Sequence, residues 1–476
     1  MTRQEFDVVV IGGGVGGVAA VRKLASAGLA VALVEDRLVG GECHYWGCNP
    51  SRTLLRPVEV FNLAKAVPGV REIIPDAVVN VPAVLAKRDL IIECLSDQDR
   101  TESLRQAGVT IFHGFGRLSG HRTVCVANAD NSEAVLTARH AVVVATGTRP
   151  HLPELHGLEQ AHPWTNRDLT TMTQVPRRAL VVGGGPVAVE FVTILSGLGS
   201  TVTLLVRGST LLHNLEPEAR ELIAQSLRSN GAEIHFETEL SAVARPVAGG
   251  PVTATFRGRT VEVDEIIIAA GRRSNTDNIG LESVGLPVGG FVSVNDHLQA
   301  LGVSGGWLYA LGDITGRARL SHISTYHGRL VADIIAARTA GRELADSDLA
   351  ARDAGSLAQV IFTDPQVVTV GRTESQARKE GYMVRTRTAR YPGEVAFLAL
   401  YRDGFEGWAK LVIDAKANTL LGATFVGPQF SELVQAATLA LVAKIPVGLL
   451  RHAVAPHPTV SQVWDPLLSH ESELAC

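Results

Sequence analysis

Two segments of this 476-residue chain share one layout, and this repetition limits the possible fold more than any other feature. Residues 7–36 and residues 178–207 each begin with an apolar run that leads into a cluster of glycines. A helix-forming stretch with small side chains, a second glycine turn and another apolar run follow in both. About 30 residues in this order are typical of a βαβ unit, in which a helix connects two parallel strands. The chain is therefore predicted to contain two nucleotide-binding folds.

The first glycine cluster fits the pattern G-x-G-x-x-G through Gly12, Gly14 and Gly17. Glycine suits such a turn because the backbone takes a positive φ and approaches a pyrophosphate with no Cβ in the way. The N-terminus of the next helix then presents its N–H groups and its positive dipole end to the phosphates. Glu35 ends the second apolar run, where a carboxylate can accept hydrogen bonds from ribose hydroxyls. These features favour a dinucleotide site over a glycine turn without a ligand.

The second glycine cluster reads G-x-G-x-x-A through Gly183, Gly185 and Ala188. Its second apolar run ends at Val206 and Arg207, with no acidic residue where the first motif has its glutamate. An arginine at this place can bind the 2′-phosphate of NADP, which favours NADP over NAD. The alternative is that Arg207 is a solvated surface charge.

Cys43 and Cys48 are the only close pair among the five cysteines of the chain. In a reducing cytoplasm, such a pair favours catalysis or metal binding over a structural bridge. Cys94, Cys125 and Cys476 form no second cluster that would complete a zinc site, so no metal is expected. A redox pair and two ordinary thiols both stay open at this point.

The spacing of the two cysteines adds a geometric condition. Five residues of regular helix advance about 7.5 Å, whereas the Cα atoms of a disulfide lie roughly 4.4–6.8 Å apart. An unbroken helix would keep the sulfurs apart, but Gly47 allows a distorted turn. Asn49 and Pro50 suit the cap and the first residue of a new helix. Cys48 would then lie at a helix N-terminus, where a thiolate is stabilised.

Composition excludes several classes of protein. The 44 basic and 48 acidic side chains give a net charge of −4, and aromatic residues make up only 5%. Binding to nucleic acid would call for a basic surplus or for stacking platforms. Residues 1–7 do not begin a signal peptide, and no apolar run reaches the length of about 18 residues that a membrane span needs. We therefore expect a cytoplasmic protein that binds neither nucleic acid nor a membrane.

The remaining sequence outlines further domains. Residues 50–107 read as helical, and the residues from there to 150 as β-rich. Residues 327–341 read as a helix, and from about Asp346 the pattern changes to alternating strands followed by a long apolar helix, 431–443. The predicted division is 1–150 for a first FAD-type domain part with the cysteine pair, 151–275 for an NAD(P)-type domain, 276–345 for a second, central part of the first domain, and 346–476 for a C-terminal interface domain.

The segment GGECHYWGCNPSRTLL around the cysteines resembles the active-site segment of the class I flavoprotein pyridine nucleotide-disulfide oxidoreductases. That family includes dihydrolipoamide dehydrogenase, glutathione reductase and mercuric reductase. The resemblance covers nearly the whole chain and implies an α/β fold with two Rossmann-like domains, for FAD and NAD(P), plus a C-terminal α+β dimerisation domain. Its motifs are the glycine clusters at 12–17 and 183–188, ATGTRP at 145–150, AAGRRSNT at 269–276, LGDITG at 311–316 and APHPTVSQ at 455–462.

The resemblance implies roles for individual residues. Glu35 would bind the adenosine ribose of FAD, and Asp313 its ribityl chain. Cys48 would be the sulfur in charge-transfer contact with the flavin, and Cys43 the thiol that attacks the substrate. The residues expected at FAD are Gly12, Gly14, Gly17, Glu35, Gly41, Thr146, Gly147 and Asp313, and those expected at NADP(H), with NAD(H) less favoured, are Gly183, Gly185, Ala188, Arg207, Gly271 and Arg272.

Two positions depart from the family pattern. Arg52 replaces the lysine that is usual near the flavin, while Glu190 matches the usual partner of that lysine. An Arg–Glu pair keeps the charges, but arginine stays protonated and forms a different fork of hydrogen bonds. His457 would be the acid–base residue, supplied by the partner subunit of a homodimer. Gln462 stands where the family has a glutamate, so it can accept a hydrogen bond from the imidazole but carries no charge.

The function that this resemblance implies is electron transfer from NADPH through FAD and the Cys43–Cys48 disulfide to a small disulfide, or dithiol oxidation in reverse. The alternatives are an NAD(P)H:quinone reductase or diaphorase with an unused disulfide, a flavin-binding redox sensor, and dihydrolipoamide dehydrogenase itself, which Arg207 and Gln462 disfavour. Residues 360–371 look like mercuric reductase, but the C-terminal motif does not. The sequence names neither the disulfide substrate nor a role for Cys476.

Overall fold

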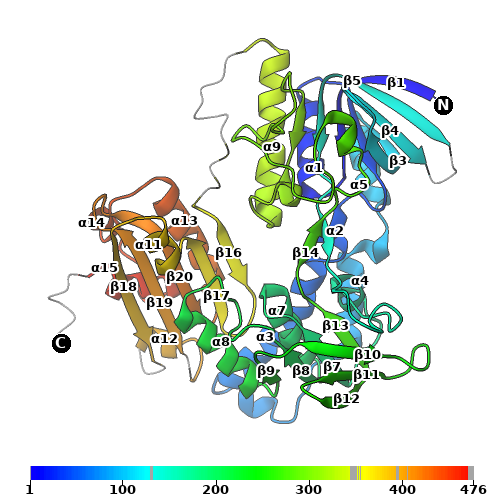
Figure 1. Cartoon of the computed structure of the whole chain (residues 1–476). Coiled ribbons are helices and arrows are strands. Elements are labelled where there is room, and N and C mark those ends of the chain that lie inside the picture. The colour runs from blue at the N-terminus through cyan, green and yellow to red at the C-terminus, as the bar shows by residue number, and fades with distance from the viewer. Residues whose placement is uncertain are drawn as a thin grey trace. The chain divides into compact units, whose positions relative to one another are not determined.

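The computed structural model describes residues 2–128, 132–342, 351, 353, 355–392, 396–404 and 406–469 (Figure 1). Cys476 and the expectation attached to it lie outside these residues. Contacts divide the chain into two compact units. Unit 1 comprises Met1–Pro50, Arg88–His151 and Arg272–Ala354, and unit 2 comprises Ser51–Lys87, Leu152–Gly271 and Gly355–Cys476. The four-part division from the sequence stays a prediction.

Unit 1 contains a six-stranded sheet with the order β1-β2-β3-β4-β5-β15, in which β1 also pairs with β5. The pairings of β1 with β2 and with β5 are parallel, as a βαβ fold requires. Val8, Val9 and Val10 of β1 are fully buried, because both faces of the sheet are covered. The strands are β1 (Thr2–Ile11), β2 (Val31–Glu35), β3 (Val109–Leu118), β4 (Thr123–Asn128), β5 (Glu133–Val144) and β15 (Leu308–Ala310).

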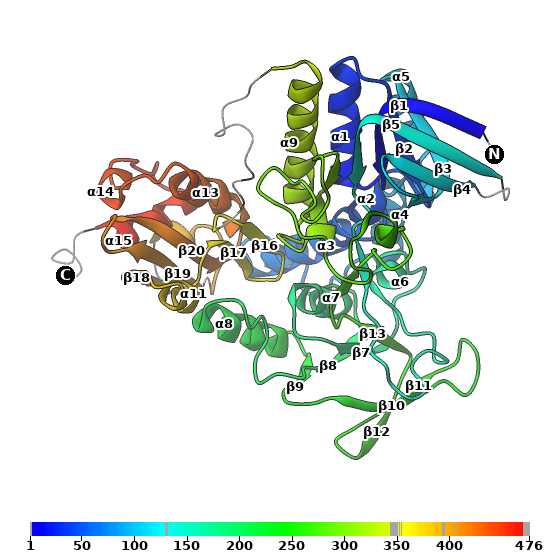
Figure 2. The same cartoon turned by 45° about the horizontal axis from the view of Figure 1, so that its top comes forward.

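Two helices of unit 1, α1 (Val15–Ser26) and α9 (Ser321–Thr339), pack side by side, as Figures 1 and 2 both show. A Cβ on Gly328 of α9 would overlap the carbonyl oxygen of Gly16 in α1, so two glycines permit the close approach. The predicted helix at 327–341 is the second half of α9. The other elements of unit 1 are α2 (Gly41–Tyr45), the first residues of α3 (Cys48–Ala66), α5 (Gln98–Gln106), and the antiparallel pair β6 (Thr148–Pro150) and β14 (Arg272–Ser274).

Unit 2 contains the second nucleotide fold, a four-stranded parallel sheet with the order β13-β7-β8-β9. Its helix α7 (Pro186–Gly197) connects β7 to β8 and buries most of its apolar side chains. The strands are β7 (Arg178–Val182), β8 (Thr201–Leu205), β9 (Glu233–His235) and β13 (Glu265–Ile268). The remaining elements of this region are α6 (Asn166–Thr170), α8 (Pro217–Ser229) and the antiparallel strands β10 (Leu240–Ala244), β11 (Val252–Phe256) and β12 (Arg259–Val263).

The C-terminal part of unit 2 is an antiparallel sheet with the order β16-β17-β20-β19-β18. Helix α13 (Val434–Val442) packs on β17 and β20, and a 3₁₀ turn at Phe430–Leu433 precedes it, so the predicted helix 431–443 is regular only in its second part. The elements are β16 (Ala358–Ile361), β17 (Gln366–Gly371), β18 (Val384–Tyr391), β19 (Gly407–Asp414), β20 (Thr419–Gly427), α11 (Glu374–Lys379), α12 (Ala396–Ala399), α14 (Val447–Leu450) and α15 (Asp465–Leu468). Helix α4 (Val81–Ile91) lies much earlier in the chain, and the boundary between the two units falls within it, after Lys87.

The predicted fold class is confirmed: an α/β protein with two Rossmann-like folds and a C-terminal α+β region. Within the described residues, no helix has the length and apolar character that crossing a membrane would require.

Candidate active site

The predicted break between the two cysteines is present. Helix α2 ends at Tyr45 and α3 begins at Cys48, with Trp46 and Gly47 between them. A Cβ on Gly47 would lie 3.0 Å from the carbonyl oxygen of Glu42, so glycine permits this tight turn. The new helix starts one residue after Gly47, earlier than the cap predicted at Asn49, because Gly47 already supplies the non-helical residue. Cys48 is thus the first residue of a helix.

Cys43 and Cys48 are both thiols in this structure, and both are partly buried. A hydrogen bond to Cys48, burial and the charge of Cys48 raise the pKa of the Cys43 thiol well above its ordinary value. The geometry therefore favours ionisation of Cys48 first, while Cys43 keeps its proton. A thiolate at Cys48 is favoured by the dipole of α3, at whose N-terminus it lies.

Ser321 is a functional candidate that the sequence did not indicate. Its hydroxyl oxygen lies 3.1 Å from the sulfur of Cys48, although 273 positions separate the two residues in the chain. Ser321 also interacts with Cys43, where it lowers the pKa against the stronger raising effects. It is the first residue of α9, so the N-terminus of a second long helix faces the thiol pair. Only the fold could reveal this contact, because Ser321 lies outside every motif that contains the cysteines.

The first glycine turn has the shape that a pyrophosphate needs. Gly12 has a φ of +104°, and a Cβ there would overlap the carbonyl oxygen of Ala145. A Cβ on Gly17 would overlap the carbonyl oxygen of Gly12, whereas a Cβ on Gly14 would meet nothing within 4 Å. No side chain of the described residues caps α1, whose N-cap is Gly14. The turn is thus closed where the protein packs and open where a phosphate would bind.

Glu35 lies beside this turn at the end of β2, as predicted. Its carboxylate accepts hydrogen bonds from the backbone N–H groups of Gly13, at 2.6 Å, and Arg37, at 2.9 Å. Burial raises the pKa of Glu35 to about 7. A Cβ on Gly41 would lie 2.7 Å from the Cα of Gly14, so Gly41 lets a second loop pack against the glycine turn. These residues fit the pyrophosphate and adenosine ribose of FAD.

Asp313 follows β15 in a short 3₁₀ turn, Gly312–Thr315. Its carboxylate accepts a hydrogen bond of 2.7 Å from the hydroxyl of Thr148, which in turn accepts one of 2.7 Å from Arg272. Arg272 also lies 3.4 Å from Glu42 in α2. Arg272, expected at NADP, is therefore hydrogen bonded to residues around the FAD motifs of unit 1, and its role toward NADP stays a prediction.

The segment 145–150 is held by backbone and side-chain bonds within unit 1. The hydroxyl of Thr146 donates to the carbonyl oxygen of Asn275 at 2.9 Å, and the N–H of Asn275 donates to the carbonyl oxygen of Gly147 at 3.0 Å. Gly147 has a φ of +67°, and Gly271 has one of +117°. Both glycines therefore occupy backbone conformations that other residues rarely adopt.

The second glycine turn is built in the same way as the first. Gly183 has a φ of +146°, and a Cβ there would overlap the carbonyl oxygen of Ala269. A Cβ on Gly185 would meet nothing within 4 Å, and Ala188 is buried in α7. Arg207 follows β8 by two residues and is exposed. The arrangement leaves an open helix N-terminus with a guanidinium beyond the end of the second strand.

Arg52 and Glu190 form the ion pair that the resemblance implied, with 2.9 Å between Nη2 and Oε1. The same carboxylate oxygen accepts a hydrogen bond of 3.0 Å from the N–H of Phe362, and the Arg52 guanidinium lies 3.7 Å from the centre of the Phe362 ring. The buried Nη1 atom of Arg52 has no hydrogen-bond partner among the described residues. Arg52 is thus held in place, and the N–H groups of its Nη1 are left for another group.

His457 is exposed and is oriented by Gln462. Its Nδ1 lies 2.9 Å from the side-chain Oε1 of Gln462. Because a carbonyl oxygen only accepts, Nδ1 carries the proton and Nε2 is left as a base. Thr459 contributes its N–H to the same oxygen at 3.4 Å. Glutamine thus fixes the tautomer that the family's glutamate would fix, without adding a charge.

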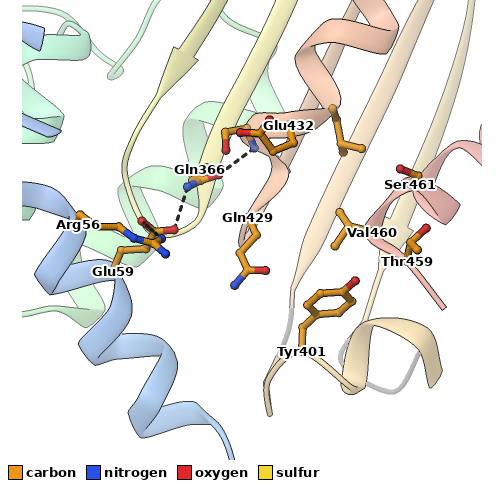
Figure 3. A pocket seen from close by; sticks show the side chains of 11 residues that line it. Arg56, Glu59, Gln366, Tyr401, Gln429, Glu432, Thr459, Val460 and Ser461 are labelled. Atoms are coloured by element: carbon orange, nitrogen blue, oxygen red, sulfur yellow. Dashed lines mark hydrogen bonds and ion pairs between the residues drawn. The ribbon is translucent and has the colours of Figure 1, made fainter. Parts of the chain in front are cut away.

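A pocket of about 460 Å³ in unit 2 adjoins the segment that follows His457 (Figure 3). Gln366 forms part of its wall, where it donates to Glu59 at 3.1 Å and accepts from the N–H of Ser431 at 2.9 Å. Thr459 and the two residues after it line the opposite side. None of the residues predicted to be functional lines this pocket. In the described part of the chain, no three His, Cys, Asp or Glu side chains are placed to hold a metal ion.

Comparison with known proteins identifies the family. Residues 6–328 match the model of the pyridine nucleotide-disulphide oxidoreductases, and residues 357–467 match the model of their dimerisation domain. The chain therefore belongs to the pyridine nucleotide-disulphide oxidoreductase family. It is an enzyme of the FAD-dependent oxidoreductases that use NAD(P)H.

Individual relatives agree with this assignment. A mercuric reductase from Streptomyces lividans is 31% identical over 96% of this chain and 94% of its own. A dihydrolipoyl dehydrogenase from Zymomonas mobilis is 29% identical over 99% of this chain and 97% of its own. The fold is similar to that of RclA, an HOCl-induced flavoprotein disulfide reductase from Escherichia coli solved as a Cu(II) complex, with a TM-score of 0.83 and 21% identity over 99% of this chain and 100% of that one.

Proposed function

We propose that this enzyme takes two electrons from NADPH and uses the Cys43–Cys48 pair to reduce a small disulfide. The observation that carries this proposal is the division of labour between the two thiols. Cys48 lies at the N-terminus of α3 and beside Ser321 of α9, while the pKa of Cys43 is raised. One sulfur is suited to remain a thiolate and the other to exchange protons. A disulfide exchange needs these two properties.

The exchange begins with a proton transfer. Because Cys43 keeps its proton, a base must accept it, and Nε2 of His457 has the tautomer for this role. The Cys43 thiolate then attacks one sulfur of the substrate disulfide, forms a mixed disulfide and expels a thiolate, which His457 protonates. Cys48 next attacks the Cys43 sulfur and expels the second substrate thiol. Two electrons have then passed from the cysteine pair to the substrate.

FAD supplies, when bound, the two-electron exchange that restores the dithiol from the nicotinamide. The chain's own residues hold it through the open N-terminus of α1, the carboxylate of Glu35 and the carboxylate of Asp313. Arg52 has a buried donor to offer, and Glu190 keeps that guanidinium in position. The replacement of lysine by arginine keeps this charge permanently positive.

Preference for NADPH follows from the end of β8. A site for the ribose of NAD commonly has an acidic residue there, whereas this chain has Val206 followed by the exposed Arg207. A guanidinium binds a phosphate with two parallel hydrogen bonds, so it suits the 2′-phosphate. NADH would find no carboxylate there to accept from its ribose hydroxyls, and it has no 2′-phosphate for Arg207 to bind.

We propose a homodimer in which His457 completes the partner's site. A match to the dimerisation domain supports this assembly. Leu439, Val442 and Leu449 of α13 and α14 are each more than half exposed, which suits a surface that a second copy covers. A cytoplasmic location agrees with the cycling dithiol, because a reducing compartment would return the pair to its thiol form.

The decisive experiment is anaerobic titration with NADPH, followed by turnover with glutathione disulfide, lipoamide and a quinone. We expect a long-wavelength absorption band from a thiolate at Cys48 after two-electron reduction, and turnover with a disulfide that Cys43→Ser abolishes. Cys125→Ser is the matched control and should keep full turnover, because Cys125 lies on β4 and its thiol donates to the hydroxyl of Ser119. Turnover that survives Cys43→Ser with a quinone as acceptor would instead identify a quinone reductase.

A further inference from the structure

The residue after each cysteine of the pair is hydrogen bonded to the residue after the other. His44 follows Cys43, Asn49 follows Cys48, and 2.7 Å separates His44 Nδ1 from Asn49 Nδ2. This bond spans five positions, the same interval as the disulfide, and it crosses the break between α2 and α3. The His44–Asn49 hydrogen bond and a Cys43–Cys48 disulfide would therefore link the same two helix ends side by side.

The charges around His44 fix the direction of this bond. Nη2 of Arg100 lies 2.9 Å from the same Nδ1 atom, and a guanidinium only donates. Nδ1 is therefore the acceptor, the ring proton is on Nε2, and the amide of Asn49 donates. Burial and the charge of Arg100 lower the pKa of His44, so the neutral ring that this bond requires is the stable form. The facing acid, Glu93, acts in the opposite direction, but less strongly.

The His44 end of the bond is anchored in unit 1. His44 is 6% exposed, and Arg100, which donates to its Nδ1, also donates to the carboxylate of Glu93 at 3.0 Å. The Nε2 atom lies 3.5 Å from the same carboxylate and makes no hydrogen bond to it. The neighbouring Tyr45 is fully buried, and its hydroxyl donates to the carbonyl oxygen of Ser96 at 3.0 Å. Tyr45 therefore points into the interior of unit 1. Anything bonded to His44 is fixed to the body of unit 1.

We propose that the His44–Asn49 hydrogen bond is a clip that holds Cys43 and Cys48 at the distance at which a disulfide forms. The backbone can move at the break between two helices. The clip excludes conformations in which the two thiols are far apart, and this raises the effective concentration of one thiol at the other. The stability of the disulfide against an external thiol rises with that concentration. His44 and Asn49 are thus positioning residues that act through the two sulfurs. The inference rests on the proposed function in one respect, that this pair is the one that cycles.

The test is an equilibrium with glutathione, made on the holoenzyme under anaerobic conditions without NADPH. One glutathione disulfide takes two electrons from Cys43 and Cys48, one proton from Cys43 and one proton from the solvent, which yields the protein disulfide and two glutathione thiols. After an acid quench and alkylation, mass spectrometry counts the blocked thiols in the peptide that holds both cysteines. The measured quantity is the equilibrium constant for formation of the protein disulfide.

We expect Asn49→Leu and His44→Leu each to lower this constant about tenfold, as the loss of one well-placed hydrogen bond does. The double variant should be within twofold of the weaker single variant, because the same bond is lost only once. His44→Gln should recover most of the constant, since its carbonyl oxygen can accept from Asn49 and Arg100. Asn62→Leu is the matched control on the same helix, where the side chain bonds Asp364, and should leave the constant unchanged.

Constants within twofold of the wild type in both single variants would overturn the clip, and so would losses that multiply in the double variant. A wild-type pair that stays dithiol at every glutathione ratio would overturn it as well. If His44→Leu does not fold, Asn49→Leu and His44→Gln still decide the outcome. Failure of the proposed function is separate, since it appears as turnover that survives Cys43→Ser, whereas the glutathione equilibrium needs no turnover.

Discussion

The two glycine turns have nearly the same backbone and different side chains where the second strand ends. Gly12 and Gly183 both have a positive φ, and a Cβ on either would overlap the carbonyl oxygen of an alanine, Ala145 or Ala269, after a neighbouring strand. The middle glycine of each motif faces open space. The phosphate cradle is therefore the same device used twice within one chain.

The difference lies beside the second glycine of each cluster. In the first turn, Gly13 donates to the carboxylate of Glu35 at 2.6 Å. In the second, a Cβ on Gly184 would lie 2.8 Å from Cγ1 of Val206, so an apolar side chain occupies the corresponding place. Arg207 comes next and is exposed. The comparison teaches that the backbone accepts any pyrophosphate, while one or two side chains select what is attached to the ribose.

The largest effect is expected when one methyl group is added to the first turn, which tests whether that turn requires glycine. Gly17→Ala places a Cβ against the carbonyl oxygen of Gly12, so the turn must open. We expect FAD affinity to fall more than about 100-fold, because the cradle and the helix N-terminus both shift. The measurement is the flavin content of the purified protein, with circular dichroism as a check of folding.

The matched substitution in the second turn is the reverse one, alanine to glycine at the corresponding position. Ala188→Gly removes a Cβ for which the second turn already has room. Even a Cβ added to Gly183 would lie 3.4 Å from the Cβ of Ala188, which is an ordinary van der Waals contact. We expect NADPH binding within threefold of the wild type and a loss of about 1 kcal/mol from the helix. A Gly17→Ala enzyme with full flavin content would show that the two turns are not constrained as described.

Arg207→Ala sharpens the comparison at the second turn. Loss of a charge-assisted bond to the 2′-phosphate costs about 1.5–3 kcal/mol, which corresponds to a fall of about 10- to 100-fold in kcat/KM for NADPH. The value for NADH should change less than twofold, since NADH has no such phosphate. Steady-state kinetics with both nucleotides decide the matter. An equal loss for both would mean that Arg207 does not read the phosphate.

Glu35→Gln is expected to have a smaller effect than Arg207→Ala, and it tests the first turn through its pH dependence. The pKa of Glu35 is about 7, so its carboxyl binds a proton below that pH. A carboxylate accepts ribose hydroxyls better than a protonated acid does, so the proton must leave when FAD binds. We expect the affinity of the apoprotein for FAD to rise with pH by at most tenfold per unit up to about 7 and then to level off.

The glutamine variant should bind FAD with no such slope and about tenfold more weakly than the wild type at pH 7 and above. Fluorescence titration of the apoprotein from pH 5 to pH 8 measures both. A slope that persists in the variant would assign the proton to a different group.

The sequence could predict those features that a local backbone requirement enforces. Gly12 and Gly183 are readable because their φ values exclude other residues, and Gly47 because a disulfide is incompatible with an unbroken helix. The Arg52–Glu190 pair came from the family pattern and is present. These predictions depend on short stretches of chain, where spacing and conformation are linked.

The residues that the sequence did not reveal are joined by tertiary contacts. Ser321 reaches Cys48 from a distant helix, and Arg272, expected at NADP, bonds Thr148 of unit 1. The His44–Asn49 bond is local, yet neither residue type predicts it, because Arg100 from α5 sets the ring's tautomer. Side-chain pairing of this kind depends on packing that composition and periodicity do not encode.

The strand order of unit 1 has a consequence for synthesis on the ribosome. The second nucleotide sheet is built from residues 178–268 without interruption, so it can close as soon as that stretch has emerged. The first sheet needs β15 beside β5, and α1 needs α9, whose last residue is Thr339. The fold that begins the chain is therefore completed after the fold that follows it. Until then, the apolar face of α1 lacks the helix that covers it, so we expect nascent chains shorter than about 340 residues to be prone to aggregation.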